Sequence, residues 1–186
     1  MNYTDKTAVQ NYTLTNINSS FDTQLAEWIA AMSRFMDKYT GRTLVAADAP
    51  ETRKYDGTGT DTLIIDDVHT ITAVTVDEAE VTPAQYPANS SRKYRLVLPR
   101  DLWITGLQNV EVTGHFGYYD AIDDGMDIKF ACTVLVAGIV NAANRQDDGV
   151  KSEKIGEYAV VYKNDEERAD YKRAMQILDN HRKMGF

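Results

Sequence analysis

The hydrophobic positions of the chain follow a helical period near both ends and an alternating period in between. The first helix is predicted over 19–41, with Ser19 or Ser20 as its N-cap and Gly41 at its end. Its apolar residues recur at steps of three and four, which is typical of a buried helix face: Phe21, Leu25, Trp28, Ile29, Met32, Phe35, Met36 and Tyr39. We interpret this stripe mainly as core. Because the stripe is wide, we expect part of it to face a neighbouring subunit.

The segment before this helix has no comparable pattern. Residues 1–18 are polar and rich in Thr and Asn, and their few apolar residues, among them Val9 and Ile17, are only loosely spaced. We therefore expect an N-terminal arm over 1–18 rather than a core element.

The alternating period covers residues 51–118 and predicts a small antiparallel sheet or sandwich inserted between helices. The strands are expected at 53–55, 62–65, 71–76, 94–98 and 110–116. The first two flank the Gly-rich segment 56–61, which we interpret as a hairpin loop between them.

A second helix is predicted over 123–145, with Asp123 or Asp124 as its cap. Its apolar residues surround the helix axis, which indicates a central helix that is buried on all sides. A last helix is expected over 165–183, because acids fill its first turn and bases its last. Its narrow apolar line could pack on the preceding segment or on a partner. These elements make the class α+β in a single domain, 1–186.

A β-hairpin is predicted over 150–163, between these two helices. Gly156 and Glu157 suit a two-residue turn, which favours Gly in its first central position. Beyond the turn, alternation gives Tyr158, Val160 and Tyr162 a shared apolar face. Such a ribbon needs a surface to lie against.

Composition and charge argue against several classes of function. The net charge is −8 with a pI near 4.8, which argues against tight binding to a phosphate backbone. The single cysteine, Cys132, rules out an internal disulfide and is expected to be a buried core residue. The first residues do not form a secretory signal, and the longest apolar run, 130–140, is too short to span a membrane.

No set of residues in the sequence has the spacing of a catalytic, metal-binding or nucleotide-binding site. Segment 56–61 lacks the ligand positions of a calcium loop and the helix that follows a nucleotide-binding loop. The three histidines have no zinc-site spacing, and the acidic pairs at 123–124 and 147–148 lie in predicted helix-flanking loops. We therefore expect no enzyme activity, no metal and no cofactor.

Several motifs follow one another along the chain: RFMDKYTGR (34–42), ETRKYDG (51–57), the segment 71–77, NVEVTGHFGY (109–118) and VKSEKIGEYAVVY (150–162). In this order they resemble the head-to-tail connector (adaptor) proteins of tailed bacteriophages with long tails. The match spans about residues 20–163. The resemblance implies a structural virion protein of the neck, assembled in the host bacterial cytoplasm as a homo-oligomeric ring, usually of twelve copies. Such a ring docks on the portal protein above and meets a stopper or tail-terminator protein below, and DNA passes through it without specific binding or any membrane.

The residues expected to form these contacts fall into three groups. Candidates for the ring's side faces are Trp28, Met32, Phe35 and Met36. Candidates for docking on the portal lie near the C-terminus: Tyr171, Met175, Leu178, Met184 and Phe186. Candidates for the lumen or the border between subunits lie in the hairpin: Lys151, Lys154, Ile155 and Tyr158.

Two alternatives remain open at this stage. One is a stopper or tail-completion protein of the same neck. The other is a carbohydrate-binding module, whose aromatic platform would consist of Trp103, Tyr118 and Tyr119.

Overall fold

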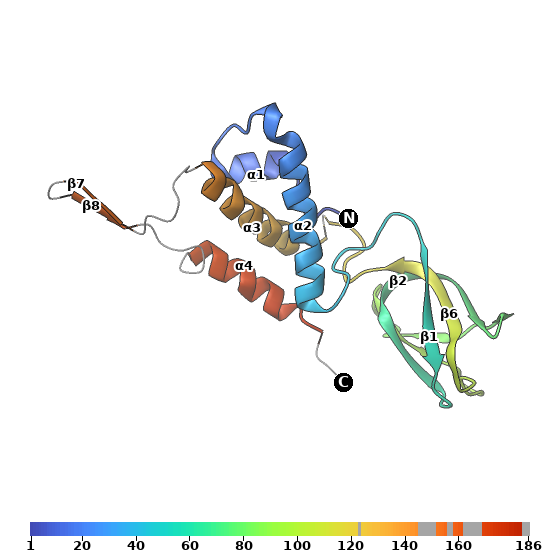
Figure 1. The fold of residues 1–186 in the computed structure, drawn as a ribbon. Coiled ribbons are helices and arrows are strands. Elements are labelled where there is room, and N and C mark those ends of the chain that lie inside the picture. The colour runs from blue at the N-terminus through green and yellow to red at the C-terminus, as the bar shows by residue number, and fades with distance from the viewer. Residues whose placement is uncertain (123, 145–151, 156–157, 162–168, 184–186) are drawn as a thin grey trace. The chain divides into compact units, whose positions relative to one another are not determined.

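The fold is known from a computed structural model, which describes residues 1–122, 124–144, 152–155, 158–161 and 169–183 (Figure 1). The chain divides into two compact units. A helical unit consists of Met1–Gly41 and Gly125–Phe186, and a β unit of Arg42–Asp124. Four α-helices and a six-stranded antiparallel sheet confirm the predicted α+β class.

The helical unit is organised around its central helix. It comprises α1 (Lys6–Thr13), the 3-10 turn η1 (Ser19–Phe21), α2 (Asp22–Thr40), α3 (Met126–Asn144) and α4 (Ala169–Asn180). Helices α1, α2 and α4 all contact α3. Every residue from Ala131 to Ala137 is buried, as are Ile128 and Val140. The prediction of a central helix is confirmed, but burial on all sides holds only for its middle, because Ile139 is partly exposed and Met126 and Ala142 are exposed.

Helix α3 is also long and apolar enough to cross a membrane by length and composition, contrary to the expectation from the apolar run alone. Core helices of soluble proteins share these properties. Three neighbouring helices pack against α3, and half of the apolar stretch Met126–Ala143 is buried.

The first eighteen residues differ from the expected arm. They contain α1, whose N-cap Asp5 accepts a hydrogen bond from the amide of Ala8 at 2.9 Å. Tyr3 and Val9 are completely buried, and Ile17 is nearly so. The prediction of an arm was wrong because so short a helix exposes little periodicity, and tertiary packing on α3 stabilises it instead.

The limits of α2 follow from local chemistry. Neither Ser19 nor Ser20 caps α2, which begins after Phe21 without a side-chain cap. The preceding turn η1 is capped by Asn18, whose side chain accepts a hydrogen bond from the Ser20 amide. At the other end Gly41 has a φ of +69°, a left-handed conformation that glycine adopts without strain. The predicted end at Gly41 is confirmed.

The β unit contains β1 (Glu51–Gly57), β2 (Thr62–Val76), β3 (Ala79–Glu80), β4 (Ala84–Tyr86), β5 (Lys93–Val97) and β6 (Gly106–Phe116). The sheet order is β1-β6-β2-β5-β4, with β3 on β2, and all pairs are antiparallel. Its core is one cluster of buried residues: Leu63, Ile65, Val68, Val74, Val76, Leu96, Trp103, Val110, Val112 and Phe116.

Two strand predictions need correction. The strands on either side of 56–61 do not pair with each other, because β6 lies between β1 and β2. Turn residues indicate a reversal of the chain but not which strand will be the neighbour. The strands expected at 62–65 and 71–76 are one strand, β2, and its pairing with β5 and β6 contains register shifts of the kind that β-bulges produce.

The first and last segments of the β unit are hydrogen bonded to each other. The amide of Ala46 donates to the Tyr119 carbonyl, and the amides of Tyr118 and Tyr119 donate to the carbonyls of Thr43 and Leu44, each at 2.9 Å. The chain thus enters and leaves the sheet along two adjacent, bonded segments.

The predicted hairpin is present as β7 (Ser152–Ile155) and β8 (Tyr158–Val161), a two-stranded sheet of its own. Its turn, Gly156 and Glu157, lies outside the described residues, as does the predicted start of the last helix at 165–168.

Candidate functional site

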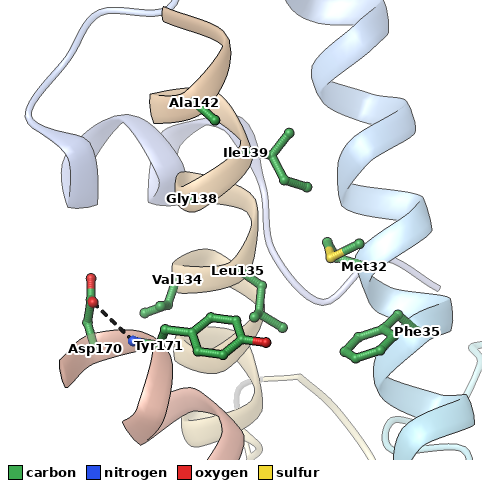
Figure 2. Close-up of a pocket in the computed structure, with 9 residues that line it drawn as sticks. All are labelled: Met32, Phe35, Val134, Leu135, Gly138, Ile139, Ala142, Asp170 and Tyr171. Carbon is green, nitrogen blue, oxygen red and sulfur yellow. Dashed lines mark hydrogen bonds between the residues drawn. The ribbon is translucent and has the colours of Figure 1, made fainter. Parts of the chain in front are cut away.

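The helical unit contains an apolar groove between α2, α3 and α4 (Figure 2). Its volume is about 380 Å³. The residues that line it are apolar except for one carboxylate: Met32, Phe35, Val134, Leu135, Gly138, Ile139, Ala142, Asp170 and Tyr171. An apolar hollow of this kind suits contact with another apolar surface.

Helix α2 supplies one wall. Met32 and Phe35 are three residues apart and so lie on the same helix face. The Phe35 side chain is 40% exposed, although its ring packs on that of Tyr39 at a centroid distance of 5.8 Å. Met36 is 0% exposed and cannot meet a neighbouring copy while the unit is folded. Of the four predicted side-face residues, Met32 and Phe35 line the groove, Trp28 is half-buried on the same helix, and Met36 belongs to the core.

Helix α3 supplies the floor. Gly138 and Ala142 are four residues apart on one face, and their small side chains leave room between the larger Leu135 and Ile139. Neither residue was predicted as part of a site. The sequence does show them as two small residues at helical spacing within an otherwise bulky apolar helix.

Helix α4 supplies the other wall through Asp170 and Tyr171. In Figure 2 the Tyr171 ring extends from α4 toward Phe35. Asp170 is already occupied, because one of its oxygens accepts from the Tyr171 amide at 3.0 Å and the other from the Tyr12 hydroxyl at 2.6 Å. The carboxylate therefore fixes the wall and leaves the groove itself apolar.

The rest of α4 is held tightly to the unit. Ala174 and Leu178 are fully buried. The Tyr39 hydroxyl donates to Asp179 at 2.7 Å, and the amide of Lys183 donates to the Thr40 carbonyl at 2.7 Å. The apolar line of the last helix thus packs on its own unit.

Because of this packing, not all of the residues expected to dock on the portal are accessible. Leu178 cannot contact another protein in the folded unit because its side chain is 0% exposed. Tyr171 and Met175 are half-buried and keep some access, while Met184 and Phe186 lie outside the described residues.

The end of α4 is further tied down through His181. Its Nδ1 lies 2.8 Å from the Ile177 carbonyl oxygen, and its Nε2 lies 3.4 Å from a carboxylate oxygen of Asp127 on α3. The ring therefore bridges two helices of the same unit, which is a structural role.

The hairpin candidates are placed only by backbone register. Ile155 pairs with Tyr158, and Lys154 pairs with Ala159. Lys151 lies outside the described residues.

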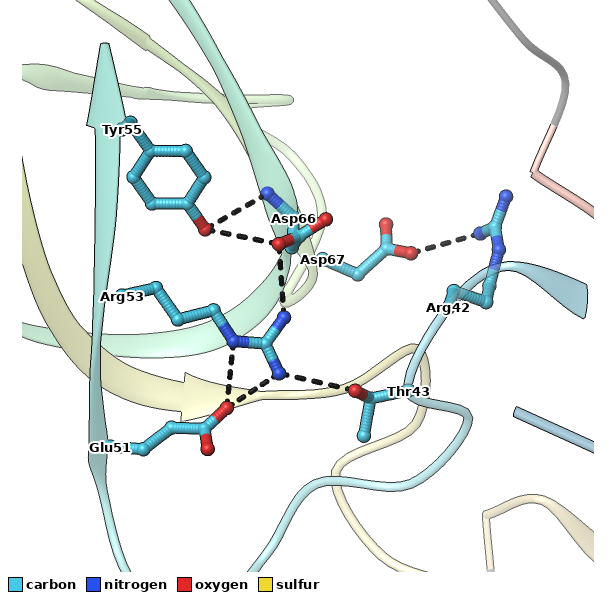
Figure 3. A network of polar contacts seen from close by, with 7 residues as sticks. All are labelled: Arg42, Thr43, Glu51, Arg53, Tyr55, Asp66 and Asp67. Atoms are coloured by element: carbon cyan, nitrogen blue, oxygen red, sulfur yellow. Dashed lines mark hydrogen bonds and ion pairs between the residues drawn. The ribbon is translucent and has the colours of Figure 1, made fainter. Parts of the chain in front are cut away.

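In the β unit, charged groups form a separate network (Figure 3). The Arg53 guanidinium donates to Asp66 at 3.0 Å and to Thr43 at 3.1 Å, and pairs with Glu51 at 2.5 Å. The Tyr55 hydroxyl donates to Asp66 at 3.3 Å. Burial, and after it the negative charge of Asp66, raises the pKa of Tyr55 above its ordinary value. The network braces the start of the sheet through mutually satisfied charges.

A second part of the network surrounds Asp67. Arg42 donates to its carboxylate at 2.9 Å, and Arg92 lies 3.4 Å from the other oxygen. Both guanidinium groups also approach the Tyr118 ring, at 5.0 and 4.0 Å from its centroid. The Tyr118 ring is in turn in edge contact with that of Tyr119.

These contacts rule out the aromatic platform of a carbohydrate-binding module. Trp103 is 0% exposed and donates its indole N–H to the Asp61 carbonyl at 3.1 Å. A sugar cannot stack on a ring that is enclosed in the core of the sheet.

His69, His115 and Cys132 all contact other residues of the fold. His69 Nε2 lies 3.1 Å from the Tyr118 carbonyl, and His115 Nδ1 lies 3.1 Å from the Ala47 carbonyl. Cys132 is buried, and burial raises the pKa of its thiol to about 12 despite a contact with Ser33 that lowers it. Within the described part of the chain, no three His, Cys, Asp or Glu residues are placed to hold a metal ion.

Comparison with known structures shows where this fold occurs. The chain is similar to one from the "neck of empty GTA particle computed with C6 symmetry", at a TM-score of 0.62 and 13% identity, over 97% of this chain and 89% of that one. It is also similar to one from the "neck of native GTA particle computed with C12 symmetry", at a TM-score of 0.58 and 14% identity, over 97% and 91%. A third, from the "virion of native gene transfer agent (GTA) particle", has a TM-score of 0.59 and 16% identity, over 96% and 90%.

At these identities the likeness shows a shared fold. No curated protein sequence matches the chain. The family whose sequences do match is described as "Head completion protein", and it covers residues 4–184, which is nearly the whole chain. The protein therefore belongs to the head completion protein family, which confirms the resemblance to the connectors that join head and tail in phage-like particles.

Proposed function

We propose that this structural neck protein is a head-to-tail adaptor that forms a homo-oligomeric ring, of about twelve copies, on the portal protein of a phage-like particle. The family match over residues 4–184 carries the proposal. A related fold in a particle neck computed with C12 symmetry supports the copy number. The apolar groove, with Phe35 partly exposed beside it, supports contact between copies.

In this role the protein has no enzymatic activity and needs no cofactor. The ring lines the neck channel, through which DNA passes during genome ejection. A net charge of −8 suits such a channel, because it disfavours adhesion of the phosphate backbone.

The ring sits between two other proteins of the virion neck, with the portal above and a stopper or tail-terminator protein below. It assembles in the host cytoplasm and makes no membrane contact. Contacts between copies use the exposed part of α2, including Trp28, Met32 and Phe35. The hairpin, with Lys151, Lys154, Ile155 and Tyr158, lies at the lumen or the subunit border.

The C-terminal segment docks on the portal through Met184 and Phe186, with Tyr171 and Met175 nearby. The sharpest test removes only residues 184–186, because the contacts of His181 and Lys183 to the helical unit then remain. We expect this truncated chain to form rings but to lose binding to immobilised portal protein. The Leu14→Ser variant, which changes a side chain that is 92% exposed elsewhere, is the matched control and should bind normally. Equal binding by both variants would reject docking through this segment.

Native mass spectrometry and portal binding together test the whole proposal. The expected result is a closed complex of about twelve chains that binds portal protein. A chain that stays monomeric at all concentrations and does not bind portal would overturn it. A ring that binds a stopper or tail protein but not portal would instead support the alternative of a lower layer of the neck.

A further inference from the structure

The β7–β8 ribbon has no other strand beside it in the part of the chain that the structure describes. It forms a two-stranded sheet apart from the six-stranded one. Two-stranded ribbons are marginally stable in water by themselves and gain stability when they pack on another surface.

The register gives this ribbon two unlike faces. Ile155 pairs with Tyr158, and Glu153 pairs with Val160. Directly paired residues share a face, as do residues two apart in one strand. Ile155, Tyr158 and Val160 therefore share one face with Glu153, which pairs with Val160 on the side away from the turn. Ala159 belongs to the other face, with Lys154.

The groove in the helical unit is a surface of matching character. Its lining is apolar, and its one carboxylate, Asp170, is already hydrogen bonded to Tyr12 and to the Tyr171 amide. Met32 and Phe35 leave apolar side-chain surface accessible at its α2 wall. Covering such a surface is favourable because it removes apolar area from water.

We propose that the groove of one copy binds the β7–β8 ribbon of a second copy through the face that carries Ile155 and Tyr158, at the end nearest the turn. This inference rests on the proposed ring, whose side contact it specifies. Each chain carries one ribbon and one groove, so each copy can donate to one neighbour and accept from the other. A contact of this kind is heterologous and closes into a ring by rotation.

Chain length allows the ribbon to reach a neighbour. Seven residues, 145–151, connect α3 to β7, and seven more, 162–168, connect β8 to α4. Seven extended residues reach about 24 Å. Every copy that carries a ribbon also carries a groove, so a second copy supplies one groove for each ribbon.

Disulfide trapping between two differently tagged chains tests the contact. Both chains carry Cys132→Ala; one also carries Met32→Cys in the groove and the other Tyr158→Cys in the ribbon. After mixed assembly and mild oxidation we expect a covalent dimer that contains both tags. The control replaces Met32→Cys by Ala26→Cys, an exposed position on the same helix, and should give at least tenfold less of this dimer.

The outcomes separate this inference from the proposed function. Rings of full mass without the mixed dimer would overturn the inference and leave the adaptor function standing. Chains that form neither rings nor mixed dimers would overturn both. A chain that carries both cysteines and closes an internal disulfide in place of the dimer would show that the ribbon occupies its own groove, which also overturns it.

A second measurement avoids oxidation. Tyr158→Asp places a charge beside Ile155 at the apolar end of this face, and we expect it to shift the native mass from ring to monomer while the circular dichroism stays unchanged. Ala159→Asp introduces the same charge on the opposite face and should leave the ring intact. Equal ring yields from the two variants would contradict the proposal.

Discussion

The hydroxyl of Tyr3 donates a hydrogen bond of 2.5 Å to a carboxylate oxygen of Asp37, thirty-four residues further along the chain. The backbone amide of Tyr3 also donates to the Ser33 hydroxyl at 3.0 Å. The third residue of the chain is thus bonded to two positions on α2, one turn apart. The N-terminal segment is consequently a structural part of the helical unit.

Replacing Tyr3 by Phe tests this attachment. The variant keeps the buried ring but leaves Asp37 without this donor, and we expect it to lower the free energy of unfolding by about 1.5–3 kcal/mol, as for a hydrogen bond to a charged group. Urea denaturation measures the change. Tyr94→Phe, at a tyrosine in the β unit that is 40% exposed, should have almost no effect. Identical curves for the two variants would mean that the segment is not held in this way.

Leu178 should behave as a core residue. Leu178→Ala removes a fully buried side chain between α4 and its neighbours, and we expect a loss of about 2–5 kcal/mol in the free energy of unfolding. Leu14→Ala, at an exposed position, should change it by less than about 0.5 kcal/mol. If Leu178→Ala weakened portal binding without lowering stability, the residue would be a docking residue after all.

The thiol of Cys132 should be inert in the folded protein. It is buried, and the raised pKa of about 12 leaves very little thiolate at neutral pH. We expect a maleimide reagent at pH 7.5 to leave the native protein unlabelled and to label it completely in 6 M guanidinium chloride. Rapid labelling without denaturant would show that α3 opens or that the thiol is reachable.

Tyr55 should make the β unit sensitive to alkaline pH. Burial and the nearby Asp66 raise its pKa in the folded state above the ordinary value of 10.0. The folded state therefore holds its proton more tightly than the unfolded state does, so this contribution is complete below pH 10 and is lost as pH rises through the folded pKa. Thermal unfolding from pH 9 to 11 should show a steeper loss of Tm for the native chain than for Tyr55→Phe. Parallel losses would contradict this assignment.

Phe35 should matter for assembly more than for folding. Phe35→Glu places a charge at the rim of the groove, and because the side chain is already 40% exposed we expect the monomer to fold. Native mass spectrometry should then show monomers in place of rings. Thr23→Glu adds the same charge at an exposed position on the same helix and should preserve the rings. Loss of rings in both variants would point to net charge as the cause.

The sequence was most informative where local chemistry determines the structure. Gly41 ended α2 as predicted because its conformation is left-handed, and α3 was recognisable because apolar residues surround it. It was least informative where contacts between residues far apart in the sequence determine the structure. Val9 is buried only because α1 packs on α3, and β1 lies beside β6 although β2 is closer in sequence.

The candidate site was predicted in part for the same reason. A helical stripe identifies Met32, Phe35 and Met36 as apolar positions, but it does not tell which of them faces a neighbouring helix. Packing against α3 and α4 buries Met36 and leaves Phe35 accessible. The groove itself requires residues from three helices, and their meeting is a property of the tertiary structure.

The bonded pair of segments that leads into and out of the sheet, 43–46 and 117–119, has a consequence for evolution. An insert whose two ends are adjacent can be replaced by a smaller or larger one without changing the distance between the two chain segments that flank it. A β unit of another size would therefore leave the connection between α2 and α3 unchanged.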